Sequence, residues 1–332
     1  MNETALEFNA IEELVSVVVP VFFGMIAVTG LFGNSLVILV VIANPQMRST
    51  TNLLIVNLAV ADLLFVIFCI PFTATDYVLS QWPFGDTWCK CVQYLIVLFA
   101  HASIYTLVLM SLDRYLAVVH PIRSRSIRTE KYTRMAITIL WVVICTAFSP
   151  IAFMHGLDYC DSTEDTLCCR FLYTTYPMAT FHITFMATSF IVPLVLISGL
   201  YIRMIIRLWT TVVGNKLSTE SQKGRKRVTR LVVVVVVAFA SLWFPIQVIL
   251  VLKSVDMYSM DSTFKVLLQI FSQTLAYTSA CINPLLYAFL SENFRKAFRK
   301  AIPCFTKYHG YRSGCQDLPR RSSAGINCTT SI

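Results

Sequence analysis

An acidic residue, Asp62, stands inside a long apolar segment, where a carboxylate is an unusual side chain. A charge within a bilayer is costly, and an acid there marks function by default. A carboxylate at that depth suits a cation or proton site. The alternative is a buried acid that neighbouring hydroxyl and amide groups satisfy. We expect the cation or proton site because the cost of that burial is high.

Asp113, Arg114 and Tyr115 form a second polar group at one end of the third apolar segment. Cys89 lies 25 residues before Arg114, which corresponds to about 37 Å of helix at about 1.5 Å per residue. One helix therefore carries a cysteine at one membrane face and an Asp-Arg pair at the other. Adjacent residues do not face each other on a helix, so Asp113 can hold Arg114 in one state and release it in another. The alternative is an interfacial charge that only snorkels.

Prolines interrupt the last three apolar segments, at Pro193, Pro245 and Pro284. Each removes one backbone hydrogen bond and favours a kink. Trp243 precedes Pro245 by two residues, and an aromatic side chain beside a kink can couple ligand contact to helix movement. Three such sites in successive helices, each beside polar or aromatic residues, favour a mechanism in which helices move.

Long apolar segments must position these groups. The chain has 332 residues and is 14% charged, whereas a soluble domain is about 25% charged. A spanning helix needs about 20 apolar residues, and long runs that do not alternate exclude a β-barrel. We therefore predict an all-α membrane protein, a seven-transmembrane helix bundle. Its helices are expected at 16–42, 52–79, 87–119, 133–154, 177–209, 228–253 and 264–289.

The bundle is expected to fill residues 16–290, with an N-terminal tail at 1–15. Beyond it, Phe294 and Phe298 share one face at i, i+4, with basic residues around them. That pattern predicts a short amphipathic C-terminal helix at 291–303 on the membrane surface, followed by a cytoplasmic tail at 304–332. Cys304 follows at membrane level and is a palmitoylation candidate, with an unmodified thiol as the alternative.

Basic residues fix the expected orientation. Of the 27 Lys and Arg, 23 fall on one side of the bundle. The positive-inside rule then places the chain in the plasma membrane with the N-terminus outside and the C-terminus in the cytosol. The net charge of +9 reflects this topology and attraction to anionic lipid, not nucleic-acid binding. The outer segments hold 12 acids against four bases, which favours a cationic ligand, with a solvated rim as the alternative.

The side expected to face outward also carries a glycosylation candidate and several cysteines. Asn2 begins an Asn-Glu-Thr acceptor and is a glycosylation candidate. Disulfides persist outside the cell. The cysteines expected there are Cys89, Cys91, Cys160, Cys168 and Cys169.

Taken in order, residues 16–304 resemble the rhodopsin-like G-protein-coupled receptors. The residues that carry the resemblance are Gly33, Asn34, Leu58, Ala59, Asp62, Cys89, Asp113, Arg114, Tyr115, Trp141, Pro193, Tyr201, Phe239, Trp243, Pro245 and 283–287. Ile96 stands where amine receptors carry an acid, and Tyr277 where opsins carry the retinal lysine. Strings at 71–79, 82–85, 102–112 and 245–254 look like allatostatin A receptors, which are relatives of the galanin receptors.

The resemblance implies a neuropeptide receptor for a short amidated peptide that signals mainly through an inhibitory G protein. Arrestin and a receptor kinase are the implied partners of the C-terminal tail. An alternative is a receptor for another short peptide, of somatostatin, opioid or kisspeptin type. From a different class, a membrane transporter also uses broken helices and buried acids, but transporters usually show inverted repeats, and none is visible. An enzyme is not expected.

For the outer half, the resemblance implies a Cys89–Cys169 disulfide that anchors the second outer loop over a pocket. The expected ligand-binding residues are Asp76, Trp82, Gln93, Ile96, His182, Gln247, Leu250, Gln273 and Tyr277. The three Gln amides can donate to and accept from a peptide carboxamide. The alternative is that they only hold helices together.

For the inner half, some receptors carry an acid at the start of helix six that locks Arg114. Here Arg225, Lys226 and Arg227 occupy that region, so we expect no such lock and some ligand-free activity. The expected coupling and activation residues are Asp113, Arg114, Tyr115, Pro121, Ile122, Tyr201, Phe239, Trp243, Pro245, Asn283, Pro284 and Tyr287.

The resemblance also implies an allosteric sodium ion, and no other cofactor. Its expected site comprises Asp62, Ser103, Ser279 and Asn283. Ala280 stands where the family usually carries a hydroxyl, and fewer oxygens around a hard cation should weaken its binding.

Overall fold

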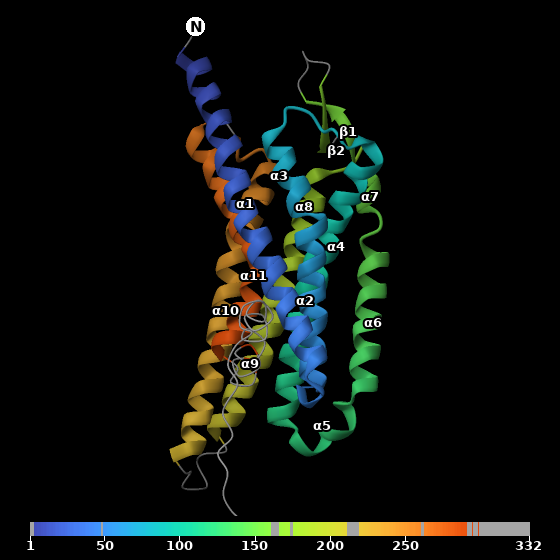
Figure 1. Cartoon of the computed structure of the whole chain (residues 1–332), viewed down its shortest axis with the longest axis vertical. Coiled ribbons are helices and arrows are strands. Elements are labelled where there is room, and N and C mark those ends of the chain that lie inside the picture. Colours follow the sequence, from blue (N-terminus) through green and yellow to red (C-terminus); the bar gives the residue numbers. More distant parts are fainter. Residues whose placement is uncertain are drawn as a thin grey trace, which may run out of the picture.

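Long helices run side by side along one axis of the molecule (Figure 1). The computed structural model describes residues 3–47, 49–160, 166–172, 175–210, 219–259 and 262–290, with Phe294 and Phe298; for 3–12, 219–233, 235 and 287–290 it describes the backbone alone. The predicted candidates Asn2 and Cys304 lie outside these residues. The N-terminus and a β-hairpin share one end of the bundle, and helix α5 (Pro121–Ile127) lies at the opposite end (Figure 1).

Seven helical spans make up the bundle, as predicted. Within the described residues, six stretches are long and apolar enough to cross a bilayer, and α11 completes the bundle against α1 and α10. The spans are α1 (Glu3–Ala43); α2 (Thr50–Phe68) with α3 (Ile70–Val78); α4 (Gly85–Val119); α6 (Glu130–Ala147) with α7 (Ile151–Met154); α8 (Met178–Met186), η2 (Ala187–Ile191) and α9 (Val192–Thr210); α10 (Thr219–Ser254); and α11 (Thr263–Leu290). A short turn, η1 (Pro45–Met47), joins the first two.

The start of the first helix differs from the predicted boundary, whereas the C-terminal segment does not. Helix α1 begins at Glu3 rather than near residue 16, because the intervening segment is rich in the helix formers Glu, Ala and Leu. In the predicted amphipathic segment, Phe294 and Phe298 are both helical. Their rings lie 5.7 Å apart and pack in one cluster with Val37 of α1 and Ile55 of α2. The buried face of that segment therefore lies against the first two spans.

The second span is broken at Cys69, where a single helix was predicted over 52–79. Cys69 ends α2 and precedes α3, and Pro71 follows in the first turn of α3. Proline is tolerated in a first turn, where its missing N–H leaves no hydrogen bond unmade, but not in a helix interior. The break separates α2 from α3, which lies toward the hairpin end of the bundle (Figure 1).

The fifth span contains a π-helical turn, η2, just before Pro193. The amide of Val192 donates to the carbonyl of Ala187, five residues earlier. Pro193 has no N–H with which to continue the regular ladder, and π-turns of this kind commonly mark functional positions. By contrast, Pro245 and Pro284 lie inside α10 and α11 without ending either helix.

Polar contacts tie the spans together inside the apolar core. Nδ2 of Asn34 donates to the carbonyl of Ala280 at 2.8 Å and joins α1 to α11. Asn57 of α2 donates to Thr106 of α4 at 2.8 Å and accepts from Nε1 of Trp141 on α6 at 2.9 Å. No water within the hydrocarbon can satisfy such groups, so each polar side chain fixes the helix that satisfies it.

A β-hairpin covers the outer end. Strands β1 (His155–Tyr159) and β2 (Leu167–Phe171) pair antiparallel, with His155 opposite Phe171 and Tyr159 opposite Leu167. A disulfide joins Cys89 at the start of α4 to Cys169 of β2, the pairing that the resemblance implied.

A second disulfide closes the tip of the hairpin between Cys160 and Cys168. The sequence had left this pairing open. Among the described cysteines, Cys91 is a free thiol.

Single cysteine variants can test both pairings. In the unreduced receptor, Cys168→Ser should make Cys160 reactive to an alkylating agent, and Cys169→Ser should make Cys89 reactive. The Cys89–Cys169 bridge spans 80 residues and the other spans 8, so Cys169→Ser should lower the thermal midpoint more. Mass spectrometry of the alkylated peptides reads the outcome, with Cys91→Ser as the control that frees no partner. Release of Cys89 by Cys168→Ser would disprove the assignment.

Candidate functional site

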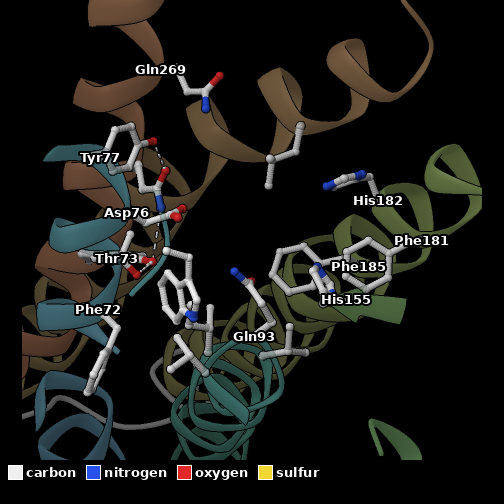
Figure 2. A pocket seen from close by; sticks show the side chains of 17 residues that line it. Phe72, Thr73, Asp76, Tyr77, Gln93, His155, Phe181, His182, Phe185 and Gln269 are labelled. Atoms are coloured by element: carbon white, nitrogen blue, oxygen red, sulfur yellow. Dashed lines mark hydrogen bonds between the residues drawn. The ribbon is translucent and has the colours of Figure 1, made fainter. Parts of the chain in front are cut away.

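A cavity of about 370 Å³ opens beneath the hairpin, between the outer ends of the helices (Figure 2). Its walls come from α3, α4, α8, α10, α11, the hairpin and the segment before α4. The lining residues are Phe72, Thr73, Asp76, Tyr77, Trp82, Val92, Gln93, Ile96, Val97, His155, Phe181, His182, Phe185, Leu250, Gln269, Gln273 and Tyr277.

One wall is polar and joins α3 to α11. The hydroxyl of Tyr77 donates to Oε1 of Gln273 at 2.6 Å, and Nε2 of Gln273 donates to the hydroxyl of Tyr277 at 3.2 Å. That hydroxyl also shares a hydrogen bond with Thr73 at 3.1 Å. These four side chains are hydrogen-bonded to one another, and Figure 2 shows Thr73 and Tyr77 on the same side of the cavity as Asp76. The wall is therefore held rigid before any ligand arrives.

The opposite wall is aromatic and comes from α8 and the hairpin. The ring of Phe181 lies 5.8 Å from His155, 5.2 Å from Phe171 and 6.3 Å from Phe185. Burial lowers the pKa of His155 to about 4, so this ring is neutral at pH 7. Figure 2 shows His155, Phe181, His182 and Phe185 gathered across the cavity from Asp76. The cavity thus offers hydrogen-bonding groups on one side and apolar rings on the other.

Of the nine predicted ligand-binding residues, eight line this cavity and Gln247 does not. Gln247 is fully buried, and its Nε2 donates to Oγ of Ser189 at 2.8 Å. Its position on α10 turns the amide toward the π-turn η2 rather than toward the cavity, so the cavity does not support a ligand contact at Gln247. It holds two helices together, which is the alternative that the sequence had left open for the Gln residues.

The sequence reasoning missed several lining residues. Gln269 precedes Gln273 and Tyr277 on the same face of α11 at a spacing of four, and Thr73 and Tyr77 share that spacing on α3. Helical periodicity from the predicted residues would have found them. His155 had no such signal, because its strand comes from a loop. The residues missed are Phe72, Thr73, Tyr77, Val92, Val97, His155, Phe181, Phe185 and Gln269.

Asp62 lies at the centre of the bundle and links three spans. Its Oδ1 accepts from Ser103 of α4 at 2.7 Å, and its Oδ2 accepts from Nδ2 of Asn283 of α11 at 2.8 Å. Ser279 contributes its carbonyl, which accepts from Asn283 at 3.3 Å. Asp62, Ser103 and Asn283 therefore meet as expected, whereas the Ser279 side chain forms no hydrogen bond with Asp62.

At the opposite end, Asp113 pairs with Arg128 rather than with Arg114. Nε of Arg128 lies 2.7 Å from Oδ1, and Nη2 lies 3.1 Å from Oδ2. Thr51 of α2 donates to the same carboxylate at 2.6 Å. Among the described residues Arg114 forms no ion pair. In this structure Arg128 occupies the Asp113 carboxylate through two parallel bonds, so Arg114 is in the released arrangement, and its capture by Asp113 in another state stays a prediction.

The other expected coupling and activation residues lie either toward the α5 end of the bundle or in its core. The hydroxyl of Tyr201 accepts from Ser111 at 3.2 Å, which joins α9 to α4. Ile122 of α5 is 89% exposed, as an apolar contact for a partner would be.

In the core, Phe239 and Trp243 of α10 are buried, and Phe239 stacks on Phe190 of η2 at 5.9 Å. Asn283 accompanies Asp62, Pro284 approaches Gly33, Pro121 opens α5, and the Tyr115 ring contacts His120. The Tyr287 side chain lies outside the described part of the chain.

A seven-span bundle with a roofed cavity at one end and an Asp-Arg-Tyr sequence at the other has the architecture of a transmembrane receptor. The chain belongs to the seven-transmembrane receptors of the rhodopsin family, whose family model matches residues 33–287.

Named relatives point to one branch of that family. The chain is 56% identical to the allatostatin-A receptor of Bombyx mori over 317 residues, 95% of this chain and 88% of that receptor. It is 36% identical to galanin receptor type 2 of Mus musculus over 288 residues, with 86% and 76% covered, and 33% identical to galanin receptor type 1 of Homo sapiens over 323 residues, with 96% and 91% covered. These relatives are receptors and not enzymes.

Arg128 should control exchange at the inner face. In Arg128→Ala, Asp113 loses its bidentate partner and becomes available to the neighbouring Arg114, while α5 loses its tie to α4. A hydrogen bond to a charged group contributes about 1.5–3 kcal/mol, so nucleotide exchange on the G protein should fall by roughly tenfold or more, with ligand binding retained. Lysine cannot bind the carboxylate through two parallel bonds, so nucleotide exchange in Arg128→Lys should lie between that of the unmodified receptor and that of Arg128→Ala.

Arg125→Ala is the matched control, because Arg125 is exposed on α5, three residues before Arg128, and forms no ion pair with the described residues. Exchange should be measured at matched surface expression. An equal loss in the Arg125 variant would assign the effect to general positive charge and not to the Asp113 pair.

Proposed function

We propose that this chain is a receptor for a short amidated neuropeptide of the allatostatin A or galanin type. The supporting observation is the two-sided cavity, whose amide and hydroxyl wall faces an aromatic wall. A peptide end carries both kinds of group, since its backbone donates and accepts while its side chains fill apolar space. The relatives named for allatostatin A and galanin favour the same ligand class.

The receptor signals through a heterotrimeric G protein, mainly an inhibitory one. The exposed Ile122, and Arg114 with no ion pair to the described residues, support a docking surface at the α5 end. The C-terminal tail is the proposed contact for arrestin and a receptor kinase. The N-terminus and hairpin face outward and the α5 end faces the cytosol of the cell that carries the receptor in its plasma membrane. Two disulfides at the hairpin end support that orientation, since disulfides persist in oxidising surroundings.

Agonist-dependent nucleotide exchange tests the function directly. Membranes containing the receptor should be screened with synthetic allatostatin A and galanin peptides, with somatostatin, opioid and kisspeptin-type peptides as competitors. Exchange on an inhibitory G protein with the first group alone is the expected result. Potency toward a competitor, with none toward allatostatin A or galanin peptides, would overturn the ligand assignment.

Arg114 provides the test of coupling. Because coupling is reciprocal, a bound G protein must raise agonist affinity as much as the agonist raises G-protein affinity. Arg114→Ala should keep surface expression and low-affinity peptide binding but lose the G-protein-dependent increase in affinity, which is typically about 5- to 150-fold. Competition binding with and without G protein gives the measurement. A variant that keeps the full increase would rule out Arg114 as the bridge.

We also propose a weak allosteric sodium ion at Asp62. The carboxylate and the Ser103 hydroxyl are suitable oxygen donors. Two features weaken the fit: Asn283 already donates to Oδ2, and Ala280 supplies no hydroxyl. The site thus offers few free oxygens to a cation.

Sodium should therefore lower agonist affinity by less than about fivefold, at the low end of allosteric couplings. Ala280→Ser should enlarge the effect and Asp62→Asn should abolish it. Agonist binding would be titrated with sodium against a large organic cation at constant ionic strength. A sodium effect well above that size in the unmodified receptor would show that Ser103 and water complete the site unaided.

A further inference from the structure

Two hydrogen-bond acceptors in the polar wall have no donor from the protein. Asp76 of α3 lines the cavity and forms no hydrogen bond or ion pair with the described residues. Oε1 of Gln269 on α11 is buried, with the side chain 92% enclosed, and has no hydrogen-bond partner among those residues. An amide oxygen that is removed from water without a donor is unfavourable. A group that brings donors into this wall would relieve that cost.

The neighbours of these acceptors are already satisfied. Tyr77, Gln273 and Tyr277 bond to one another in series. Figure 2 shows Gln269, Tyr77 and Asp76 following one another along the same wall. The open acceptors therefore flank a network whose hydrogen bonds are made among its own members and not to them.

The basic residues Arg170 and Lys90 do not donate to the Asp76 carboxylate either. Nη1 of Arg170 on β2 donates to the carbonyl of Tyr159 at 3.3 Å, and Lys90 pairs with Asp86. Neither forms an ion pair with Asp76. The charge of Arg170 acts on Asp76 from beyond contact distance, and the carboxylate is left facing the cavity without a direct partner.

We propose that Asp76 and Gln269 together receive an N–H-rich group of the peptide, namely a guanidinium, an ammonium or a terminal carboxamide. An adjacent apolar or aromatic group of the peptide then lies against Phe181 and Phe185. This assignment rests on the proposed peptide-receptor function. A carboxylate at the same place would be repelled by Asp76 and would bring no donor to Gln269, so the wall selects against an anionic group.

A cycle between receptor and peptide tests the contact. The probe is a synthetic allatostatin A peptide in four forms: the amide, the free acid, the N-acetylated amide, and an amide whose basic side chains are replaced by citrulline or norleucine. Asp76→Asn keeps the shape of the side chain and removes its charge. It should weaken the parent amide by at least about tenfold, the usual effect of losing a hydrogen bond to a charged group. Asp158→Asn, on the hairpin but outside the cavity, should leave potency unchanged.

One of the three altered peptides lacks the group that Asp76 binds, so its potency at the unmodified receptor should already be about tenfold lower than that of the parent amide. Asp76→Asn should cause no further loss of potency for that peptide. Non-additivity of this kind identifies two groups in contact, and the form that shows it says which source of N–H is bound. Gln269→Leu should weaken the same peptide form selectively. If Asp76→Asn weakens all four forms equally, or none of them, the proposal is wrong.

Small fragments separate this proposal from the peptide assignment. The full-length receptor in nanodiscs would be heated with 3-phenylpropionamide, 2-phenylethylguanidine or 3-phenylpropionate. At least one of the two donor fragments should raise the thermal midpoint of the unmodified receptor and not that of Asp76→Asn, while the carboxylate should not. The wall assignment would be overturned if the carboxylate raised the thermal midpoint as much as the donor fragments did, or if none of the three fragments raised it. If the peptides fail at the unmodified receptor while the donor fragments bind as described, only the peptide-receptor function is refuted.

Discussion

A carboxylate within the hydrocarbon must receive its hydrogen bonds from the protein itself, and the arrangement of this bundle depends on how it supplies them to Asp62. Its two oxygens accept from Ser103 of α4 and Asn283 of α11, so one side chain fixes three spans. The Asn34 amide ties α1 to α11 in the same way. Apolar side chains cannot choose between helix neighbours in lipid, because the lipid is equally apolar. Polar contacts of this kind therefore set which helices lie together, and the cavity and inner face follow from that arrangement.

The two ends of the molecule are linked through the fifth and sixth spans. Phe185 lines the cavity at the end of α8, and the π-turn η2 follows at once. Gln247 binds Ser189 of that turn, and Phe239, about two helical turns away on α10, stacks on Phe190. A ligand that moved α8 would thus bear on α10 through both contacts. Gln247 lies outside the cavity but stands between the cavity and the aromatic core.

Sequence alone predicted the features that depend on periodicity and on charge. The seven spans follow from the length of the apolar runs, whereas Asp76, Gln273 and Tyr277 were expected from the family resemblance. Local backbone changes were not accessible in this way. The break at Cys69 and the π-turn before Pro193 depend on how freed carbonyls find partners in the folded bundle. No local pattern in the sequence encodes the direction of the Gln247 amide or the pairing of Arg128 with Asp113. Both depend on how the helices are placed in the folded bundle.

The Asp113–Arg128 pair changes how the inner face is to be understood. An adjacent Asp-Arg pair suggests a lock within one helix, yet the carboxylate here is occupied by a residue from beyond α5 and by Thr51 of α2. The energy of that ion pair therefore stabilises the position of α5, the helix that presents Ile122, and does not restrain Arg114. If the α5 end is the coupling surface, as proposed, this division has a use: Arg128 fixes the position of α5, while the charge of Arg114 is not committed to Asp113.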